Sequence, residues 1–345
     1  MNSNSILKRE FTFLERLYLR LHRWKYHHRK KNQAIFHDKF VISIGNLTTG
    51  GTGKTPLTIF LSEFFLKRGF SVLIVHRGYK GKFSGELLVS SDGKIHVSSF
   101  VSGDEAYLIA HQLLEKNYKN FKVVCGKNRK KLISDYGNDA QIVILDDAFQ
   151  NPSVYRNWDV VLLDTTISPM KYKLLPLGRF REPLDELSRA DVIFLTRKNE
   201  KPNDFDFWFE LSKGFQKPIF FSEVRLHAIE PELQQKEVLV VCGIGNPHSF
   251  LRLIEGSFHI KKAWIYPDHH QFKEKEIQSW LKYKIPILIT EKDWVRLIHH
   301  KVYQENTSYF HKVKINLKIE DFLEFEKKLE ESLYGFGFLV RTMEK

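Results

Sequence analysis

The chain has 345 residues, 42% of them hydrophobic and 28% charged, which is the composition of a globular protein with two domains or one large one. Its cysteines, Cys125 and Cys242, each end an apolar run, so we expect buried thiols and neither a disulfide framework nor a cysteine-based metal site. The net charge is +13, but no stretch of 18 uninterrupted apolar residues is present and basic residues interrupt any candidate signal sequence, so we expect no membrane-spanning helix and no signal peptide.

Residues 1–33 are basic and amphipathic. The first 40 residues hold ten Lys or Arg and three acids. Apolar side chains recur there at helical spacing: Leu7, Phe11, Leu14, Leu17, Tyr18, Leu21 and Trp24. Such a helix either lies on an anionic membrane surface or packs on a domain with its charges in water. No nucleic-acid-binding motif follows, so we do not expect a nucleic acid partner.

A glycine-rich loop follows the first predicted strand, residues 40–44, and precedes a predicted helix at 56–67. This order is typical of a P-loop, in which backbone N–H groups surround phosphate oxygens. Lys54 is predicted to reach the β- and γ-phosphates and Thr55 to bind Mg²⁺. Thr48 stands where the motif usually has its first glycine. The predicted phosphate-binding residues are Thr48, Thr49, Gly50, Gly51, Thr52, Gly53, Lys54 and Thr55.

The rest of the chain alternates buried strands with helices, which indicates a parallel sheet covered on both faces. Strands are predicted at 71–75, 121–125, 141–145, 158–163 and 190–195, with a hairpin around Asp92-Gly93. The basic run 127–131 opens a helix at 127–136 and is interpreted as a solvated face. The predicted fold class is α/β: a P-loop NTPase-like parallel sheet with helices on both faces, plus a smaller α/β C-terminal domain.

The smaller domain is expected to begin near residue 218, where the pattern restarts. Its strands are predicted at 218–224, 237–242, 262–266, 285–290 and 309–315, and its helices at 247–255, 273–282, 291–299 and 319–334. The first of these strands is expected to pair with the last. The predicted units are therefore an N-terminal helix (1–33), a P-loop domain (34–217) and a second domain (218–345) that contributes to the active-site cleft.

Polar residues follow several of the predicted strands, at the edge where ligands bind on parallel sheets. Asp146 and Asp147 end an apolar run in the Walker B arrangement and are predicted to hold Mg²⁺. Arg77 and the loop at 176–183 also follow strands. Asp104 and Glu105 open a helix, where acids are favoured by the helix dipole as well as in sites.

The reaction class is open on these motifs alone. Thr290-Glu291-Lys292-Asp293 lies where a GTPase reads its base, but its lysine is one position late. The second P-loop lysine of ParA-type ATPases is absent between residues 45 and 53. A kinase needs a base near the acceptor hydroxyl. Pro267-Asp268-His269-His270 is a candidate for this chemistry, although such a motif could also bind a metal or cap a helix and, taken alone, is more often structural.

Together these motifs resemble the tetraacyldisaccharide 4′-kinases of lipid A synthesis. They occur in the order of that family over about residues 40–295: Gly45 to Pro56, Arg77-Gly78-Tyr79, Gly103-Asp104-Glu105, Asp146 to Gln150, Leu175 to Pro183, Pro267 to His270 and Thr290 to Asp293. In that family a small hydroxyl residue commonly occupies the position of Thr48. The chain departs from the family pattern at Ala148 and Asn151, where glycine and histidine are usual, and at His76 and Lys80, where serine and glycine are common.

The resemblance implies ATP-dependent phosphorylation of the 4′-hydroxyl of a tetraacyldisaccharide 1-phosphate, with ATP and Mg²⁺ as cofactors. It implies Asp104 as catalytic base, His269 as its partner from the second domain and Lys54 as a third catalytic residue. Gln150 would join the nucleotide-binding loop, and Thr55, Asp146 and Asp147 the metal. The residues implied to line the substrate side are Arg77, Tyr79, Glu105, Arg181 and Glu182.

The resemblance also implies a glycolipid substrate and a peripheral location on the cytoplasmic face of the inner membrane, with the N-terminal helix on the membrane surface. No obligate protein partner is expected. The competing hypothesis is a membrane-associated P-loop ATPase or GTPase switch without a lipid acceptor. It would hydrolyse its nucleotide in the absence of lipid.

Overall fold

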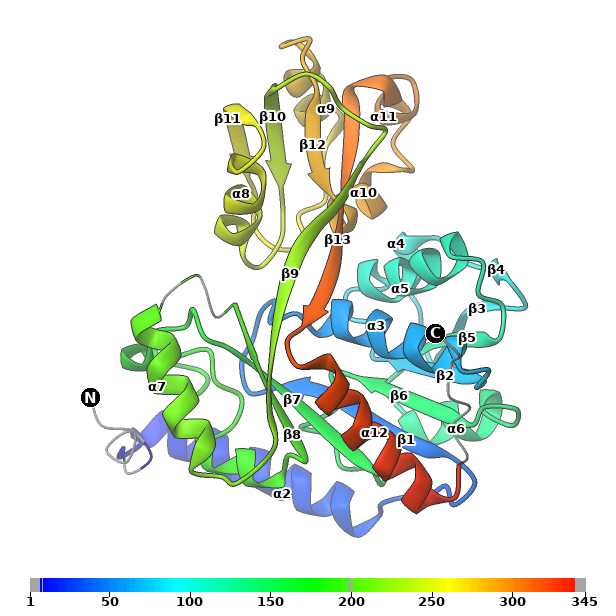
Figure 1. The fold of residues 1–345 in the computed structure, drawn as a ribbon, viewed down its shortest axis with the longest axis vertical. Helices are drawn as coiled ribbons and strands as arrows, with labels where there is room; N and C mark the ends of the chain where they lie inside the picture. The colour runs from blue at the N-terminus through cyan, green and yellow to red at the C-terminus, as the bar shows by residue number, and fades with distance from the viewer. Residues whose placement is uncertain (1–6, 8, 198–199, 201, 339–345) are drawn as a thin grey trace.

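The computed structural model describes residues 7, 9–197, 200 and 202–338, so the predictions for residues 1–6, 8 and 339–345 lie outside the described part. One sheet of 13 strands runs through two lobes (Figure 1). We call the larger one, built on β1 to β8, the P-loop lobe, and the smaller one, built on β10 to β12, the second lobe. Within the described ranges, every helix falls short of the length and apolarity that crossing a bilayer requires.

The P-loop lobe has a parallel sheet in the order β8-β7-β1-β6-β2-β5, with β3 and β4 added antiparallel at the edge. Its strands are β1 (Phe40–Asn46), β2 (Val72–His76), β3 (Glu86–Ser91), β4 (Lys94–Ile95), β5 (Phe121–Gly126), β6 (Ile142–Asp146), β7 (Trp158–Asp164) and β8 (Val192–Thr196). Strand β1 pairs with β6 on one side and β7 on the other. The loop after β1 therefore lies beside the acids that end β6, and the predicted fold class is confirmed.

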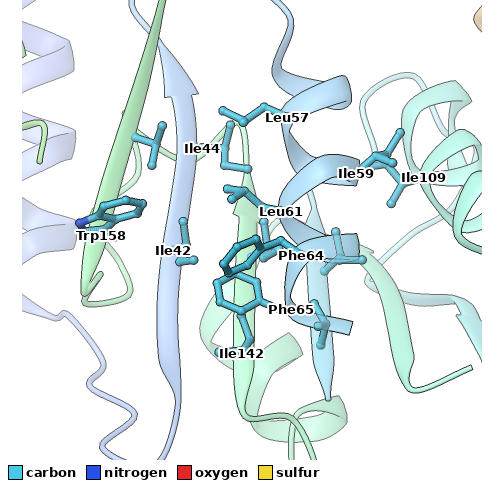
Figure 2. Close-up of a cluster of buried hydrophobic side chains, with 14 of the residues drawn as sticks. Ile42, Ile44, Leu57, Ile59, Leu61, Phe64, Phe65, Ile109, Ile142 and Trp158 are labelled. Atoms are coloured by element: carbon cyan, nitrogen blue, oxygen red, sulfur yellow. The ribbon is translucent and has the colours of Figure 1, made fainter. Parts of the chain in front are cut away.

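Helices cover both faces of this sheet because its strands are apolar on both sides. They are α2 (Phe13–Lys31), α3 (Lys54–Lys67), α4 (Ser99–Ser102), α5 (Asp104–Glu115), α6 (Arg129–Tyr136), α7 (Pro202–Lys213) and α12 (Phe322–Phe336), with 3₁₀ turns η1 (Pro169–Lys171) and η2 (Leu184–Arg189). Ile42 and Ile44 of β1 face the core shared with α3 and α5 (Figure 2), and residues of α12 belong to the same core. Val41 faces the opposite side, where α6 packs.

The second lobe repeats the three-layer arrangement on a smaller scale. It comprises β10 (Glu237–Cys242), α8 (Pro247–Glu255), β11 (His259–Ile265), α9 (Glu274–Leu281), β12 (Ile287–Thr290), α10 (Glu291–Leu297), α11 (Lys301–Gln304) and η3 (Thr307–Tyr309). Strands β11, β10 and β12 are parallel. Phe250 and Ile254 of α8 pack on one face, and Trp280 of α9 packs on the other.

Two long strands, β9 (Ile219–Glu230) and β13 (Phe310–Ile319), connect the lobes. They pair antiparallel with each other, as expected from the sequence. The start of β9 pairs with β8, and the start of β13 pairs with β12. The two lobes are therefore joined through a two-stranded antiparallel ribbon.

The closing helix α12 packs in the P-loop lobe, although the sequence-based boundary groups it with residues 218–345. The ring of Phe325 lies 5.3 Å from that of Phe194 and 5.8 Å from that of Trp158, between ring centroids. An apolar stripe on a helix indicates that the helix packs on a sheet but not on which sheet. The sequence therefore does not predict that α12 packs in the P-loop lobe. Helix α7 was also not predicted. Cys125 and Cys242 are free and buried, as expected.

Candidate active site

The loop after β1 is held against the segment 179–181. Thr49 N–H donates to the Arg179 carbonyl (2.8 Å) and Arg181 N–H donates to the Leu47 carbonyl (2.7 Å), with Thr48 opposite Phe180 in an antiparallel bridge. Extended backbone favours a β-branched residue, which explains why Thr48 fits where a P-loop usually has glycine.

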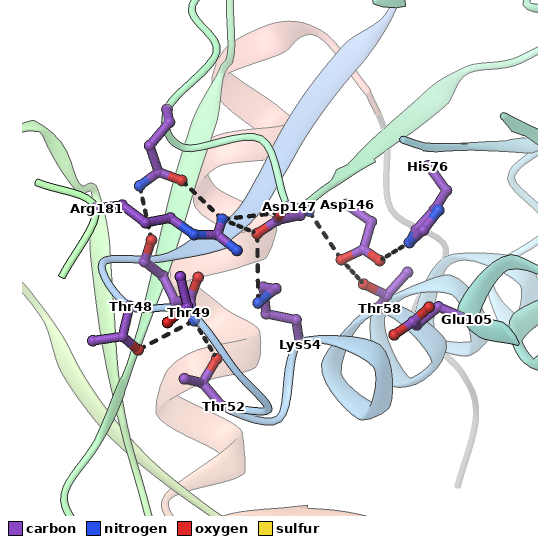
Figure 3. A network of polar contacts seen from close by, with 12 residues as sticks. Thr48, Thr49, Thr52, Lys54, Thr58, His76, Glu105, Asp146, Asp147 and Arg181 are labelled. Atoms are coloured by element: carbon purple, nitrogen blue, oxygen red, sulfur yellow. Dashed lines mark hydrogen bonds and ion pairs between the residues drawn. The ribbon is translucent and has the colours of Figure 1, made fainter. Parts of the chain in front are cut away.

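The end of the loop has the geometry expected of a phosphate cradle. Gly53 has φ of 93° and precedes α3, so its conformation favours glycine. Asn46 donates its side-chain N–H to the Thr52 hydroxyl (2.9 Å), which ties the loop to the end of β1 (Figure 3). Lys54 and Thr55 open α3, where free backbone N–H groups and the helix dipole favour an anion.

Asp146 and Asp147 occupy different environments, although they are adjacent (Figure 3). Asp146 is buried and accepts hydrogen bonds from the Thr58 hydroxyl (3.3 Å) and the Asp147 N–H (3.0 Å), while His76 Nε2 lies 3.4 Å away. Burial raises the pKa of Asp146, with His76 opposing it. The Asp146 carboxylate therefore has fewer cationic neighbours than the Asp147 carboxylate.

Asp147 is instead balanced by cations. Burial alone would raise its pKa, but Lys54 Nζ (3.4 Å) and Arg181 (2.8 and 2.9 Å) hold it well below the usual range. The described residues contain no cluster of three or more His, Cys, Asp or Glu suited to hold a metal by themselves. Thr55 and the two carboxylates are oxygen ligands that fit Mg²⁺, because this ion usually takes few protein ligands and completes its shell with phosphates and water.

Gln150 links the P-loop to a buried acid. Its amide N–H donates to the Asn46 carbonyl (2.8 Å) and to Glu182 (2.9 Å). Burial raises the pKa of Glu182 to about 7, although Arg189 pairs with it at 2.8 Å. Glu182 therefore faces Gln150 and Arg189 and does not line the cavity described below.

Asp104 and His269 meet across the two lobes. Asp104 is the first residue of α5, and His269 lies in the loop after β11 with φ of 63°. His269 Nδ1 is 3.0 Å from Asp104 Oδ2, which also accepts from Arg296 Nε at 2.7 Å. Burial raises the pKa of Asp104, but the hydrogen bond from His269 and the charge of Arg296 outweigh it and lower the pKa.

Glu105 makes a second contact between the lobes. Lys292 Nζ lies 2.6 Å from Glu105 Oε1, and His269 Nε2 lies 3.5 Å from the same atom. Burial would raise the pKa of Glu105, but Lys292 and the nearby histidines lower it to about 2. The Tyr79 ring packs edge-on against His269 at 5.6 Å between centroids.

These groups surround one cavity of about 1640 Å³ between the lobes. The predicted residues that line it are Thr49, Gly50, Gly51, Thr52, Gly53, Lys54, Thr55, Arg77, Tyr79, Glu105, Asp146, Asp147, Gln150, Arg181 and His269. Asp104 lies directly behind Glu105 and His269. Thr48 and Glu182 lie in the supporting layer. Side chains of α2, including Lys25 and Arg29, line the outer part.

Sequence reasoning missed three arginines. Arg129, taken as part of a solvated run, is buried and donates to the carbonyls of Asp146 (3.2 Å) and Asp147 (2.9 Å). Arg197 donates to the Gly51 carbonyl at 2.9 Å, and Arg296 reaches Asp104 from the second lobe. No local motif distinguishes them from surface arginines, because their partners are distant in sequence.

Comparison with known proteins identifies the family of this chain. Residues 5–334 match the family described as tetraacyldisaccharide-1-P 4′-kinase. Proteins named tetraacyldisaccharide 4′-kinase are similar: one from Desulfotalea psychrophila is 34% identical over 74% of this chain and 78% of its own length. One from Aquifex aeolicus is 31% identical over 85% and 87%.

A solved structure is similar over nearly the whole chain. The crystal structure of LpxK from Aquifex aeolicus in complex with ATP superposes with a TM-score of 0.72, is 27% identical and covers 97% of this chain and 99% of that one. The family match and this superposition both include the P-loop lobe and the second lobe. The chain belongs to the tetraacyldisaccharide-1-P 4′-kinase family.

Proposed function

We propose that this protein transfers the γ-phosphate of ATP to the 4′-hydroxyl of a tetraacyldisaccharide 1-phosphate, giving a bis-phosphorylated lipid A precursor. The observation that carries the proposal is the convergence of a phosphate-binding loop and the Asp104–His269 pair on one cavity between two lobes. The names of the relatives and the ATP complex of the Aquifex protein support the same reaction.

The nucleotide half of the reaction belongs to the P-loop and its neighbours. Residues 48–55 surround the phosphates through backbone N–H groups, Lys54 contacts the β- and γ-phosphates, and Gln150 keeps the loop in place. Thr55, Asp146 and Asp147 would hold Mg²⁺, which neutralises charge on the phosphate oxygens when bound. The N-terminus of α3 adds its dipole at the same point.

The acceptor half depends on the pair from opposite lobes. Asp104 accepts the proton of the 4′-hydroxyl as the oxygen attacks phosphorus, and the imidazole of His269 holds the carboxylate in position. The low pKa of Asp104 supports an ionised base at neutral pH. Arg77, Tyr79, Glu105 and Arg181 contact the substrate or transferring phosphate. Glu182 would act indirectly, through Gln150.

The N-terminal helix is proposed to hold the protein on the cytoplasmic face of the inner membrane. Its apolar side chains Phe13, Leu21 and Trp24 are exposed (78%, 56% and 66%), between many basic residues. Leu19 and Glu15, on another face of α2, are buried against the P-loop lobe. The helix therefore supports both readings of the sequence: it packs with one face and leaves an apolar face uncovered.

The two lobes are further proposed to act as domains that close over the substrate. Contacts such as Lys292–Glu105 and His269–Asp104 cross between them, and a two-stranded ribbon joins them. The cavity would then be completed by closure, as in other kinases with moving domains.

Incubation with the tetraacyldisaccharide 1-phosphate, Mg²⁺ and γ-labelled ATP tests the function. We expect label in a bis-phosphorylated lipid and little release of free phosphate without lipid. Absence of lipid product under these conditions, with steady ATP hydrolysis, would instead support the nucleotide-switch hypothesis.

A further inference from the structure

We infer that Arg296 is a positioning residue that fixes the placement of Asp104 and His269 relative to each other. The inference deepens the proposed function and rests on it for the role of the pair. Arg296 lies at the end of α10 in the second lobe, whereas Asp104 opens α5 in the P-loop lobe, 192 residues away. Its side chain is 1% exposed.

One guanidinium reaches both partners. Arg296 Nε donates to Asp104 Oδ2 (2.7 Å), and a terminal N–H donates to the Gly243 carbonyl (2.8 Å). The same Gly243 carbonyl accepts from the backbone N–H of His269 (3.2 Å). Arg296 thus fixes Asp104 directly and His269 through a shared carbonyl. This support matters because His269 has a left-handed backbone that a non-glycine residue seldom adopts unaided.

Asp293 fixes the guanidinium in turn. It is fully buried, lies 2.9 Å from Arg296 and accepts from the Gly243 N–H (3.0 Å) and the Thr290 hydroxyl (2.6 Å). A planar guanidinium donates in several fixed directions, which suits a group that must bind Asp104, Asp293 and a carbonyl at once. The last residue of the Thr290-Glu291-Lys292-Asp293 motif therefore acts on the site through Arg296.

The arrangement also decides which Asp104 oxygen is available. Oδ2 accepts from both Arg296 and His269. Within the described residues, Oδ1 has no hydrogen-bond partner. Oδ1 is therefore the oxygen that would accept the proton of the 4′-hydroxyl, and Arg296 and His269 set its direction.

Charge is the second contribution of Arg296. Arginine stays protonated at all relevant pH values. The charged groups around Asp104 are His269 and Arg296 from the second lobe, Glu105 beside it on α5, and Asp293 and Lys292 behind these. His269 and Arg296 favour the carboxylate, and Glu105 opposes it. Removing Arg296 should raise the Asp104 pKa and leave less of the base ionised.

The experiment compares Arg296→Gln and Arg296→Lys with Arg68→Gln, all in the full chain. Arg68 is a matched control because its side chain is also largely buried (7% exposed) and pairs with an acid, Glu326, but it lies outside the lining of the cavity. We expect Arg296→Gln to lower kcat about 10- to 100-fold, a range typical of groups that orient a reacting side chain. Its KM for ATP should stay within about twofold, and the acidic limb of the pH–rate profile should move to higher pH.

Arg296→Lys, which keeps the charge but loses the fixed set of donors, should return the acidic limb towards its wild-type position and restore only part of kcat. Arg68→Gln should leave both unchanged. In an Asp104→Asn background, Arg296→Gln should lower kcat by less than about a further twofold, because the two residues act as one unit. An equal loss of kcat in both backgrounds, or an unmoved acidic limb, would overturn the inference.

A second measurement does not depend on turnover. In protein with ¹³C-labelled aspartate, the Asp104 carboxyl of the wild type should titrate below the ordinary value of about 3.9, its resonance assigned by its loss in Asp104→Asn. The midpoint should rise in Arg296→Gln while His269 is still present, and an unchanged midpoint contradicts the inference. If the wild type phosphorylates no lipid, the proposed function fails on its own, and the two titrations still test whether Arg296 lowers the Asp104 pKa.

Discussion

Replacing Asp104 by Asn is the most informative single change. Asparagine keeps the size of the side chain, so it can still accept from Arg296, but it cannot take a proton. General-base catalysis typically contributes about 10²- to 10⁴-fold, or roughly 3–5 kcal/mol of transition-state stabilisation at 1.36 kcal/mol per tenfold. We expect kcat to fall by that amount. ATP affinity should change little, because the side-chain hydrogen bonds of Asp104 go to His269 and Arg296 of the second lobe and not to the P-loop.

The assay pairs steady-state kinetics on lipid with calorimetric titration of Mg·ATP, using His269→Gln as the companion variant. His269→Gln should cost less than Asp104→Asn, and the double variant little more than Asp104→Asn alone, because the two residues work as a pair. If Asp104→Asn weakens ATP binding by the same factor as it lowers kcat, Asp104 binds nucleotide or metal, and the assignment as base is wrong.

Four further predictions concern the proposed metal site, the N-terminal helix and the hydrophobic core. Asp147→Asn should lower Mg·ATP-dependent turnover and should destabilise the protein more at pH 7 than at pH 3. The pKa of Asp147 is depressed, so its ionised form stabilises the fold above about pH 4 and that contribution is lost as pH falls, which denaturation at both pH values would check. His76→Ser, which removes a donor near Asp146, should lower the Mg²⁺ concentration for half-maximal rate; an unchanged Mg²⁺ titration would contradict this. Trp24→Ala should reduce binding to anionic vesicles about tenfold in a flotation assay without altering the melting temperature, since the side chain is exposed. Phe325→Ala should destabilise the chain by about 3–5 kcal/mol in urea unfolding, whereas Leu323→Ala, 78% exposed on the same helix, should not.

Local chemistry explains which features were predictable. The P-loop and the acids after β6 are recognised from short patterns of neighbouring residues. The buried strands are recognised from their apolar composition. Together these patterns identified the fold and the phosphate-binding part of the cavity lining. The family resemblance supplied what the pattern could not: the pairing of Asp104 with His269.

Long-range contacts explain what was missed. Arg296, Arg129 and the docking of α12 depend on partners brought close by the folded chain. A buried arginine has the same local sequence signature as an exposed one, because its environment is set by other elements. Thr48 departs from the P-loop pattern in the sequence, and only the folded chain explains why. It makes a strand-like contact with Phe180, which lies 132 positions later.

The division of the Asp104–His269 pair between lobes has a consequence for the fate of ATP. In the proposed mechanism, a molecule with its lobes apart holds nucleotide on the P-loop while the base lacks its partner. Water in the open cavity therefore meets bound ATP without an assembled proton acceptor. In that mechanism, rotation of the lobes about the β9–β13 ribbon would separate Asp104 from His269, and the pair would be complete only with the lobes together, as in this structure. Such an arrangement would suppress hydrolysis of ATP by water in the open cavity.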